Sequence, residues 1–129
     1  METDNYIDNK IKFIQDTLYV VSGKWKLAVL ISIYHGNNRF SDLQRSIPKI
    51  TKRVLSKELK ELEANQLITR TVDENSSLIV KYLVTEYSLS LTEVVEAMAR
   101  WGELHRGKIT GKGLITTIKP KPGSEICTC

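Results

Sequence analysis

Hydrophobic residues recur with helical spacing over most of this chain, and the first such segment lies between residues 6 and 21. Five apolar side chains in that segment follow one another at intervals of four and three residues: Ile7, Ile11, Ile14, Leu18 and Val21. The spacing predicts an amphipathic helix with a narrow apolar seam, suited to packing lengthwise against another helix. The pattern alone leaves open whether that second helix belongs to the same chain or to a second copy.

A second apolar segment, residues 25–34, is hydrophobic on nearly every side. Such a helix usually lies in the middle of its domain. After a turn, the sequence from Ser41 has the spacing of a capping box, which predicts a short helix that begins there. Leu43 and Ile47 would face inward from this helix, and Pro48 would close it.

The next predicted helix, residues 52–64, has two different sides, and Thr51 is a suitable N-cap for it. Leu55, Leu59 and Leu62 are spaced four and three residues apart and define a side that would face the core. At 100° per residue, the polar side chains lie almost opposite the leucines. We refer to them as the basic row: Lys52, Arg53, Ser56, Lys57 and Lys60.

Residues 67–72 and 79–84 are rich in β-branched side chains, and the polar residues 73–77 lie between them. This pattern predicts a β-hairpin with a polar tip. Two helices joined by a turn as short as the one before Thr51 form a helix-turn-helix unit, and the added hairpin makes it a winged helix. The predicted fold class is therefore mainly α with a small β-hairpin wing (α+β).

A last helix is expected over residues 86–105, with Thr85 as its N-cap. Large apolar side chains recur along this segment at helical intervals and would form the inward side of the helix. They are six in number: Leu91, Val94, Val95, Met98, Trp101 and Leu104.

Glycines and prolines are frequent in residues 107–129, and four of these residues are basic. We expect a flexible basic tail there, after a single domain of residues 1–106. The tail ends in Cys127 and Cys129. This C-x-C spacing could serve a metal or a redox pair, but two exposed thiols are the simpler interpretation.

The chain has 129 residues, of which 41% are hydrophobic and 26% charged, which is the size and composition of one globular domain. No apolar run approaches the ~18–20 residues that span a bilayer. The N-terminal residues lack the basic and then apolar layout of a secretion signal. We therefore expect a protein that acts in the cytoplasm, without a membrane as its partner.

The formal net charge of +4 is unevenly distributed. Residues 24–70, which include the basic row, carry ten basic and four acidic side chains. Such a patch can attract phosphate groups, although a merely solvated surface would have the same composition. The helical geometry favours phosphate, because it collects Lys, Arg and Ser on one side of a helix that can enter the major groove of DNA.

Catalysis is not expected from this sequence. Its two histidines, His35 and His105, belong to no recognisable nucleophile triad, zinc motif or glycine-rich phosphate loop. No cofactor or metal is therefore predicted. A winged-helix module that binds only other proteins is the alternative to DNA binding, but it would carry an acidic or apolar outer face on helix 52–64.

Five short motifs occur in order along the chain: Gly23-Lys24-Trp25, Arg39-Phe40-Ser41-Asp42-Leu43, Val54 to Glu63 (VLSKELKELE), Lys81 to Glu86 (KYLVTE) and Ala99-Arg100-Trp101-Gly102. With these motifs the chain resembles the HxlR-type transcriptional regulators over roughly residues 10–105. No single motif is specific, but their order and spacing together are. The resemblance implies a winged helix-turn-helix fold and a regulator that binds double-stranded DNA in a bacterial or archaeal cell.

The resemblance also implies a homodimer on a palindromic operator, with the first and last helices as dimerisation helices. A second copy thereby becomes the favoured partner of the N-terminal seam. Such a regulator can also have a small-molecule effector, whose identity the sequence does not indicate. The residues expected at the dimer interface are: Ile7, Ile11, Ile14, Leu18, Val95, Met98 and Trp101.

DNA contacts are expected from three places: the start of the short helix, the basic row with its N-cap, and the hairpin. The polar residues of the hairpin tip could hydrogen-bond the DNA backbone. The full set expected at the DNA is: Arg39, Ser41, Thr51, Lys52, Arg53, Ser56, Lys57, Lys60, Asn75, Ser76, Ser77 and Lys81.

The sequence departs from the family pattern at three positions. Lys12 stands where many members have a cysteine that senses oxidants, so thiol sensing by that route is not expected. Asp73 and Glu74 begin the hairpin tip and would be repelled by phosphate, which predicts a weak minor-groove contact there. Ser88 replaces a family glycine, and we expect this exchange to matter little.

Overall fold

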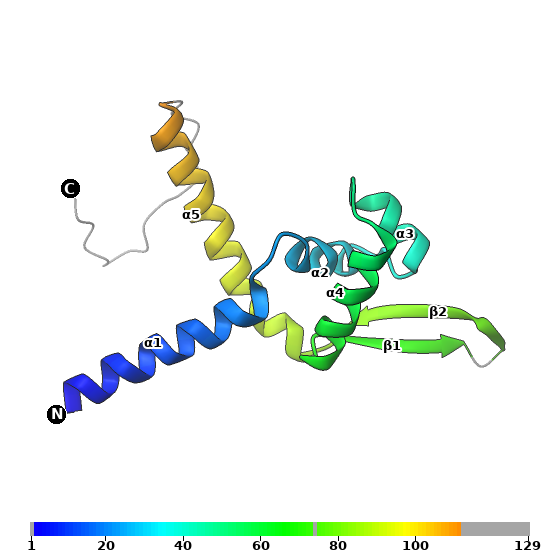
Figure 1. Cartoon of the computed structure of the whole chain (residues 1–129), viewed down its shortest axis with the longest axis horizontal. Helices are drawn as coiled ribbons and strands as arrows, with labels where there is room; N and C mark the ends of the chain where they lie inside the picture. Colours follow the sequence, from blue (N-terminus) through cyan, green and yellow to red (C-terminus); the bar gives the residue numbers. More distant parts are fainter. Residues whose placement is uncertain (1, 74, 112–129) are drawn as a thin grey trace. The chain divides into compact units, whose positions relative to one another are not determined.

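The structure is a computed structural model that describes residues 2–73 and 75–111, except for a few side chains near the N-terminus and the hairpin tip. The chain divides into two compact units, Met1–Leu89 and Ser90–Cys129. The elements in chain order are labelled in Figure 1: α1 (Glu2–Val21), α2 (Lys26–Tyr34), α3 (Phe40–Ser46), α4 (Lys52–Ala64), β1 (Ile68–Asp73), β2 (Ser76–Val84), the 3-10 helix η1 (Tyr87–Leu91) and α5 (Thr92–Thr110).

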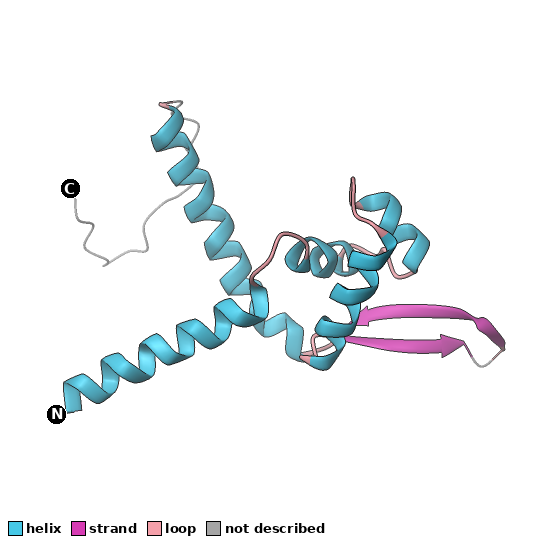
Figure 2. Cartoon of the chain, in the orientation of Figure 1, coloured by secondary structure: helices cyan, strands magenta, loops and turns pink. Residues whose placement is uncertain are grey.

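Helices make up most of the described chain, and the two strands form one antiparallel hairpin (Figure 2). The predicted fold class, mainly α with a small β-hairpin wing, is therefore confirmed. The predicted order of helix, short helix, turn, helix and hairpin is also confirmed, and α4 has the predicted bounds.

The core of the first unit lies where α2, α3, α4 and the hairpin meet. Val29, Leu43, Leu55 and Leu62 are completely buried there, and Ile68 is nearly so. Burying a side chain of this size stabilises the fold by about 1.5–3 kcal/mol. These residues come from elements far apart in the sequence, so the core holds the helix-turn-helix and the wing as one body.

Helix α2 is buried less completely than its composition predicts. Val29, Leu30 and Ile33 are buried, whereas Ile31 is 40% exposed and Tyr34 is 57% exposed. The expectation that this helix is covered on all sides is thus met on one side only. Within this unit, α2 has its contacts chiefly with α3, α4 and β2, and these elements leave Ile31 and Tyr34 uncovered.

The predicted capping box at Ser41 is wrong. Helix α3 begins at Phe40, its N-cap is Arg39 in an extended conformation, and no side chain caps it. The backbone explains the shift, because the amide of Tyr82 in β2 donates to the carbonyl of Asn38 at 2.8 Å. This bond holds the chain extended up to Arg39, so the helix starts directly after it and Ser41 falls within the first turn.

The hairpin is confirmed: β1 is shifted by one residue from the predicted segment 67–72, and β2 begins three residues earlier than the predicted segment 79–84. Ile68 pairs with Val84, and the register is regular as far as Val72 opposite Val80. Beyond that point the register shifts, so that Asp73 lies opposite Ser76. The tip is consequently tighter than the predicted segment 73–77.

The last helix differs from the prediction at both ends. Residues 87–91 form the 3-10 helix, because the hydroxyl of Thr85 accepts the amide of Ser88 at 3.1 Å and donates to the carbonyl of Gln66 at 2.7 Å. Helix α5 then runs to Thr110 and ends at Gly111, whose left-handed conformation suits a helix end. Residues 107–110, the start of the predicted flexible tail, are therefore helical, and the remainder of that tail after Gly111, with its two cysteines, lies outside the described residues.

Helix α4 ends in a Schellman motif. Gln66 is left-handed, with φ of 62°, the amide of Leu67 donates to the carbonyl of Leu62, and the amide of Gln66 donates to the carbonyl of Glu63. A residue with a Cβ atom is strained in this conformation, whereas glycine is not.

We therefore expect Gln66→Gly to raise the free energy of unfolding by up to about 1 kcal/mol, net of the extra chain entropy of glycine. Gln66→Val should lower it, because a β-branched side chain is poorly tolerated at positive φ. Urea denaturation of the parent and the two variants measures the order. A Gln66→Gly variant that is less stable than the parent would contradict the inference that Gln66 is strained at its positive φ.

Candidate nucleic-acid interface

Helix α4 is fixed by its leucine side. Leu55, Leu59 and Leu62 are buried against neighbouring elements, chiefly α2 and β1. At the start of the helix, the hydroxyl of Thr51 accepts the amide of Val54 at 3.2 Å, as the sequence predicted for an N-cap. With this side and this end fixed, the rotation of α4 about its axis is determined.

The basic row therefore points away from the core. Lys52, Arg53, Lys57 and Lys60 are exposed, and Ser56 is half-buried. The row covers about two and a half turns of a helix whose opposite side is apolar and buried. A helix held in this way can offer several cationic donors to one binding partner at once.

The turn before α4 is held by a buried pair of apolar residues. Ile47 and Ile50 are buried on either side of Pro48 and Lys49, and Lys49 is left-handed with φ of 70°. Because this residue turns the chain sharply, only residues 47–51 separate the end of α3 from the start of α4. This geometry is the helix-turn-helix that the sequence predicted.

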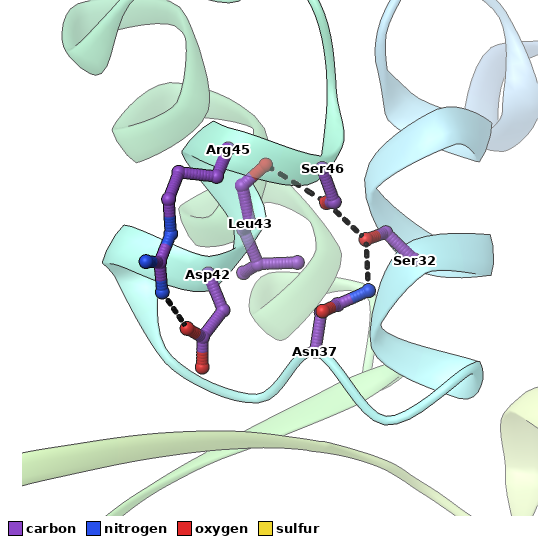
Figure 3. A network of polar contacts seen from close by, with 6 residues as sticks. All are labelled: Ser32, Asn37, Asp42, Leu43, Arg45 and Ser46. Carbon is purple, nitrogen blue, oxygen red and sulfur yellow. Dashed lines mark hydrogen bonds and ion pairs between the residues drawn. The ribbon is translucent and has the colours of Figure 1, made fainter.

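A chain of hydrogen bonds joins α3 to α2 (Figure 3). The side-chain amide of Asn37 donates to the hydroxyl of Ser32 at 3.1 Å, and the hydroxyl oxygens of Ser32 and Ser46 lie 2.6 Å apart. Ser46 in turn donates to the carbonyl of Leu43 at 3.0 Å, so Ser32 is the donor to Ser46. Sequence reasoning missed this network, because the serines are far apart in the chain and have no recognisable pattern.

An ion pair that the sequence did not reveal connects α2 with α4. The ammonium of Lys26 lies 2.7 Å from one carboxylate oxygen of Glu61, and the Lys26 side chain is only 11% exposed. Lys57 of the basic row lies 4.0 Å from the other oxygen. The hydrogen bond from Lys26 is the main reason that the pKa of Glu61 lies below its ordinary value, and the charges of Lys26 and Lys57 lower it further. Glu61 is therefore a structural partner of α2.

The start of α3 and the hairpin add further polar groups to the first unit. Arg39 and Ser41 are exposed, and so is Asn75 at the hairpin tip, whose amide donates to the carboxylate of Asp73 at 3.0 Å. Lys81 is half-buried in β2, opposite Thr71. The side chains of Ser76 and Ser77 are not described. Arg70 of β1 is exposed as well, and sequence reasoning did not single it out.

The residues expected at a dimer interface lie on both units. On α1, the side chains of the seam are each about half exposed, at 48% for Ile7 and Ile11, 50% for Ile14 and 52% for Leu18. Of the described residues of α1, Val21 alone is buried.

Helix α5 shows the same exposure of apolar side chains in the second unit. Val95 is half-buried, Met98 is 37% exposed and Trp101 is 62% exposed. The ring of Trp101 stacks on that of His105 with 4.8 Å between the ring centroids. Gly107 is the one buried residue among those described in this helix. Apolar surface of this extent on one helix is unusual for a helix with no partner.

Two features are absent from the described part of the chain. None of its helices has both the length and the apolar content needed to cross a membrane. Within the same residues, no group of three or more His, Cys, Asp or Glu side chains is placed to hold a metal ion.

The known proteins to which this chain is similar are regulators. A family model described as HxlR-like helix-turn-helix matches residues 20–110. YtcD, an HTH-type transcriptional regulator of Bacillus subtilis, is 37% identical over 98 residues, which are 76% of this chain and 78% of YtcD. The redox regulator HypR in its reduced form matches with a TM-score of 0.69 and 35% identity, over 76% of this chain and 97% of the HypR chain.

A MarR-family transcriptional regulator from Enterococcus faecalis V583 matches with a TM-score of 0.69 and 30% identity, over 79% of this chain and 93% of that one. Together with the fold, these relatives define the class of protein as a winged-helix transcriptional regulator, which is not an enzyme. Within that class, the chain belongs to the HxlR-like helix-turn-helix family.

The Lys26–Glu61 pair makes stability depend on pH. Because the pKa of Glu61 is lowered in the folded state, its contribution is complete above the ordinary carboxylate pKa and is lost as the pH falls through the folded-state pKa. We expect Glu61→Gln to lower the free energy of unfolding at neutral pH, and this difference from the parent to vanish in acid. Glu63→Gln, on an exposed residue of the same helix, is the matched control. Urea titrations across the acid range measure both, and an equal loss in the two variants would speak against the pair.

Proposed function

We propose that this chain is a sequence-specific DNA-binding regulator that docks as a homodimer on a palindromic operator, with α4 in the major groove. The observation that carries the proposal is the exposed basic row of α4 opposite three buried leucines. Lys and Arg on such a row supply charge for phosphates, and their donors fit the acceptor atoms of guanine in the major groove. YtcD and the MarR-family relative carry the name of transcriptional regulators, which supports the same role here.

The residues of the basic row would contact either bases or phosphates, depending on their position in the row. Arg53, Ser56 and Lys57 lie in the middle of the exposed side and are the proposed base readers. Lys52 and Lys60 lie toward the two ends of the row and would neutralise phosphates on either side of the groove. Thr51, Arg39, Ser41 and Lys81 are proposed as further backbone contacts, with the hairpin-tip residues Asn75, Ser76 and Ser77.

The homodimer is proposed from the apolar surface of the two outer helices. The seam of α1 is about half exposed along a helix of ~30 Å, and the apolar side chains of α5 are exposed as well. A second copy would cover both, and the two-fold symmetry would place two α4 helices in successive major grooves, about 34 Å apart. In a prokaryotic cell such a regulator would act in the cytoplasm, where the chromosome lies. A small-molecule effector would act by changing the spacing of the two α4 helices.

Selection of bound sequences from a pool of random duplexes tests the proposal directly. We expect a two-fold symmetric consensus with half-sites about one helical turn apart, and an affinity that falls steeply with salt. The alternative, a winged-helix module that binds only proteins, would give no enriched sequence and no salt-dependent binding of any duplex. The exposed basic row is the observation that disfavours this alternative.

Arg53→Ala tests base reading. If Arg53 binds guanine through both of its terminal nitrogens, the substitution should weaken binding to the selected operator by about 1–3 kcal/mol and relax the preference at one base pair. Fluorescence anisotropy with operator and random duplexes measures this, and Arg106→Ala on α5 removes an equal charge as a control. An equal loss on both duplexes would make Arg53 a phosphate contact.

Ile14→Glu tests the dimer. A carboxylate in the middle of the seam would be buried without a partner, so the protein should sediment as a monomer and lose operator binding. Asn9→Glu introduces the same charge on the opposite, polar side of α1 and should remain dimeric. Met98→Glu on α5 should resemble Ile14→Glu. A parent protein that sediments as a monomer at micromolar concentration would refute the homodimer.

A further inference from the structure

A hollow of about 500 Å³ lies between the start of α3 and the hairpin. Arg39, Phe40 and Ser41 line it from the α3 side. The hairpin contributes Arg70 from β1, and Val80 and Tyr82 from β2, with their neighbours. No part of this hollow belongs to the basic row of α4.

The backbone brings the two arginines to this place from distant parts of the sequence. The amide of Tyr82 donates to the carbonyl of Asn38 at 2.8 Å, directly before Arg39. Tyr82 is also the strand partner of Arg70. The segment at Asn38, strand β2 and strand β1 therefore lie side by side in that order. The backbones at Asn38 and Arg70 are consequently roughly 10 Å apart. Two arginine side chains can easily reach a common ligand over this distance.

Among the described residues, nothing compensates the charge of the two arginines. Arg39 and Arg70 are both exposed, and neither is in an ion pair with a described carboxylate. The lining contains no acidic residue. Arg45 on α3, in contrast, is held by Asp42 (Figure 3). Two guanidinium groups that face one hollow repel each other, and an anion between them removes this repulsion while accepting their paired hydrogen bonds.

The rest of the lining fits an anion with a less polar edge. Phe40 and Val80 are half-buried and form apolar walls, and Ser41 and Tyr82 carry hydroxyl groups that can donate to an oxygen. A backbone phosphate with its flanking sugar has this combination of charge and apolar surface. The hollow is also bordered by the start of α3 and the hairpin, the two segments that flank α4 in a helix-turn-helix with a wing.

We propose that Arg39 and Arg70 form a clamp for one backbone phosphate of duplex DNA beside the middle of the hairpin, where Arg70 pairs with Tyr82. The inference rests on the proposed DNA-binding function and adds a contact to it. Asp73 at the tip would repel phosphate, whereas Arg70 in the middle of β1 is cationic. The wing of this protein therefore contacts DNA through the middle of the hairpin, and Arg70 is the residue that sequence reasoning missed.

The test compares Arg39→Gln, Arg70→Gln and the double variant on a random duplex and on the selected operator. Each single change should weaken binding roughly tenfold on both duplexes. The slope of log affinity against log salt should become shallower by about 0.9 when the phosphate contact is lost. Because both side chains hold the same phosphate, the double variant should lose less than the product of the two single losses. Arg106→Gln on α5 is the matched control.

Each other outcome has a definite meaning. A parent protein that binds neither duplex overturns the proposed function itself. A parent that binds, with Arg70→Gln behaving like Arg106→Gln, overturns the clamp alone and leaves the hollow to a different anion. If the double variant loses as much affinity as the product of the two single losses, the arginines bind separate phosphates, which overturns the clamp. If Arg70→Gln weakens binding to the operator alone, Arg70 is a base reader, which also overturns the clamp.

A folding defect is separated from a binding defect by a second variant. Arg70→Lys keeps the charge and the length of the side chain but not the planar fork of donors. It should melt like the parent, keep the parental salt slope and bind with an affinity between those of the parent and Arg70→Gln. If Arg70→Lys binds no better than Arg70→Gln while melting like the parent, the charge of Arg70 does not act on phosphate.

Discussion

The burial of one side of α4 is the constraint on which the rest of this structure depends. Leu55, Leu59 and Leu62 are covered by α2 and β1, so the helix cannot rotate without exposing them to water. Each buried leucine contributes about 1.5–3 kcal/mol, a large part of the net stability of a small domain. The side that remains outside is therefore always the basic row. A function that needs several cations on one rigid surface follows from apolar packing on the other.

Ion pairs and unpaired charges are distributed so that the outer surface stays cationic. Lys26 holds Glu61 toward α2, which takes one of the carboxylates of α4 away from free interaction with an approaching phosphate. Asp42 is engaged by Arg45 within α3. Arg39 and Arg70 line one hollow whose lining contains no acidic side chain. Glu61 and Asp42 are thus bound to structural partners, while Arg39 and Arg70 remain available for DNA.

Both units carry exposed apolar side chains, on α1 in the first and on α5 in the second, and both surfaces need to be covered. Most large apolar side chains of the two helices stay exposed or half-exposed within their own unit, although each helix has the spacing of a packed helix. For a transcriptional regulator, covering these surfaces with a second copy would join two DNA-reading helices in a fixed spacing.

The sequence by itself determined the elements whose pattern is local. The leucine spacing and Thr51 defined α4 and its two sides, and the β-branched segments defined the hairpin, because these patterns report the period of each element and its N-cap directly. Only the tertiary structure decided where α3 begins, since the bond from Tyr82 to Asn38 overrode the capping pattern at Ser41. It likewise decided the pairing of Lys26 with Glu61 and the placement of Arg39 and Arg70 around one hollow. In both cases the residues are more than thirty positions apart, and no local period carries information about which side chains a folded backbone will bring together.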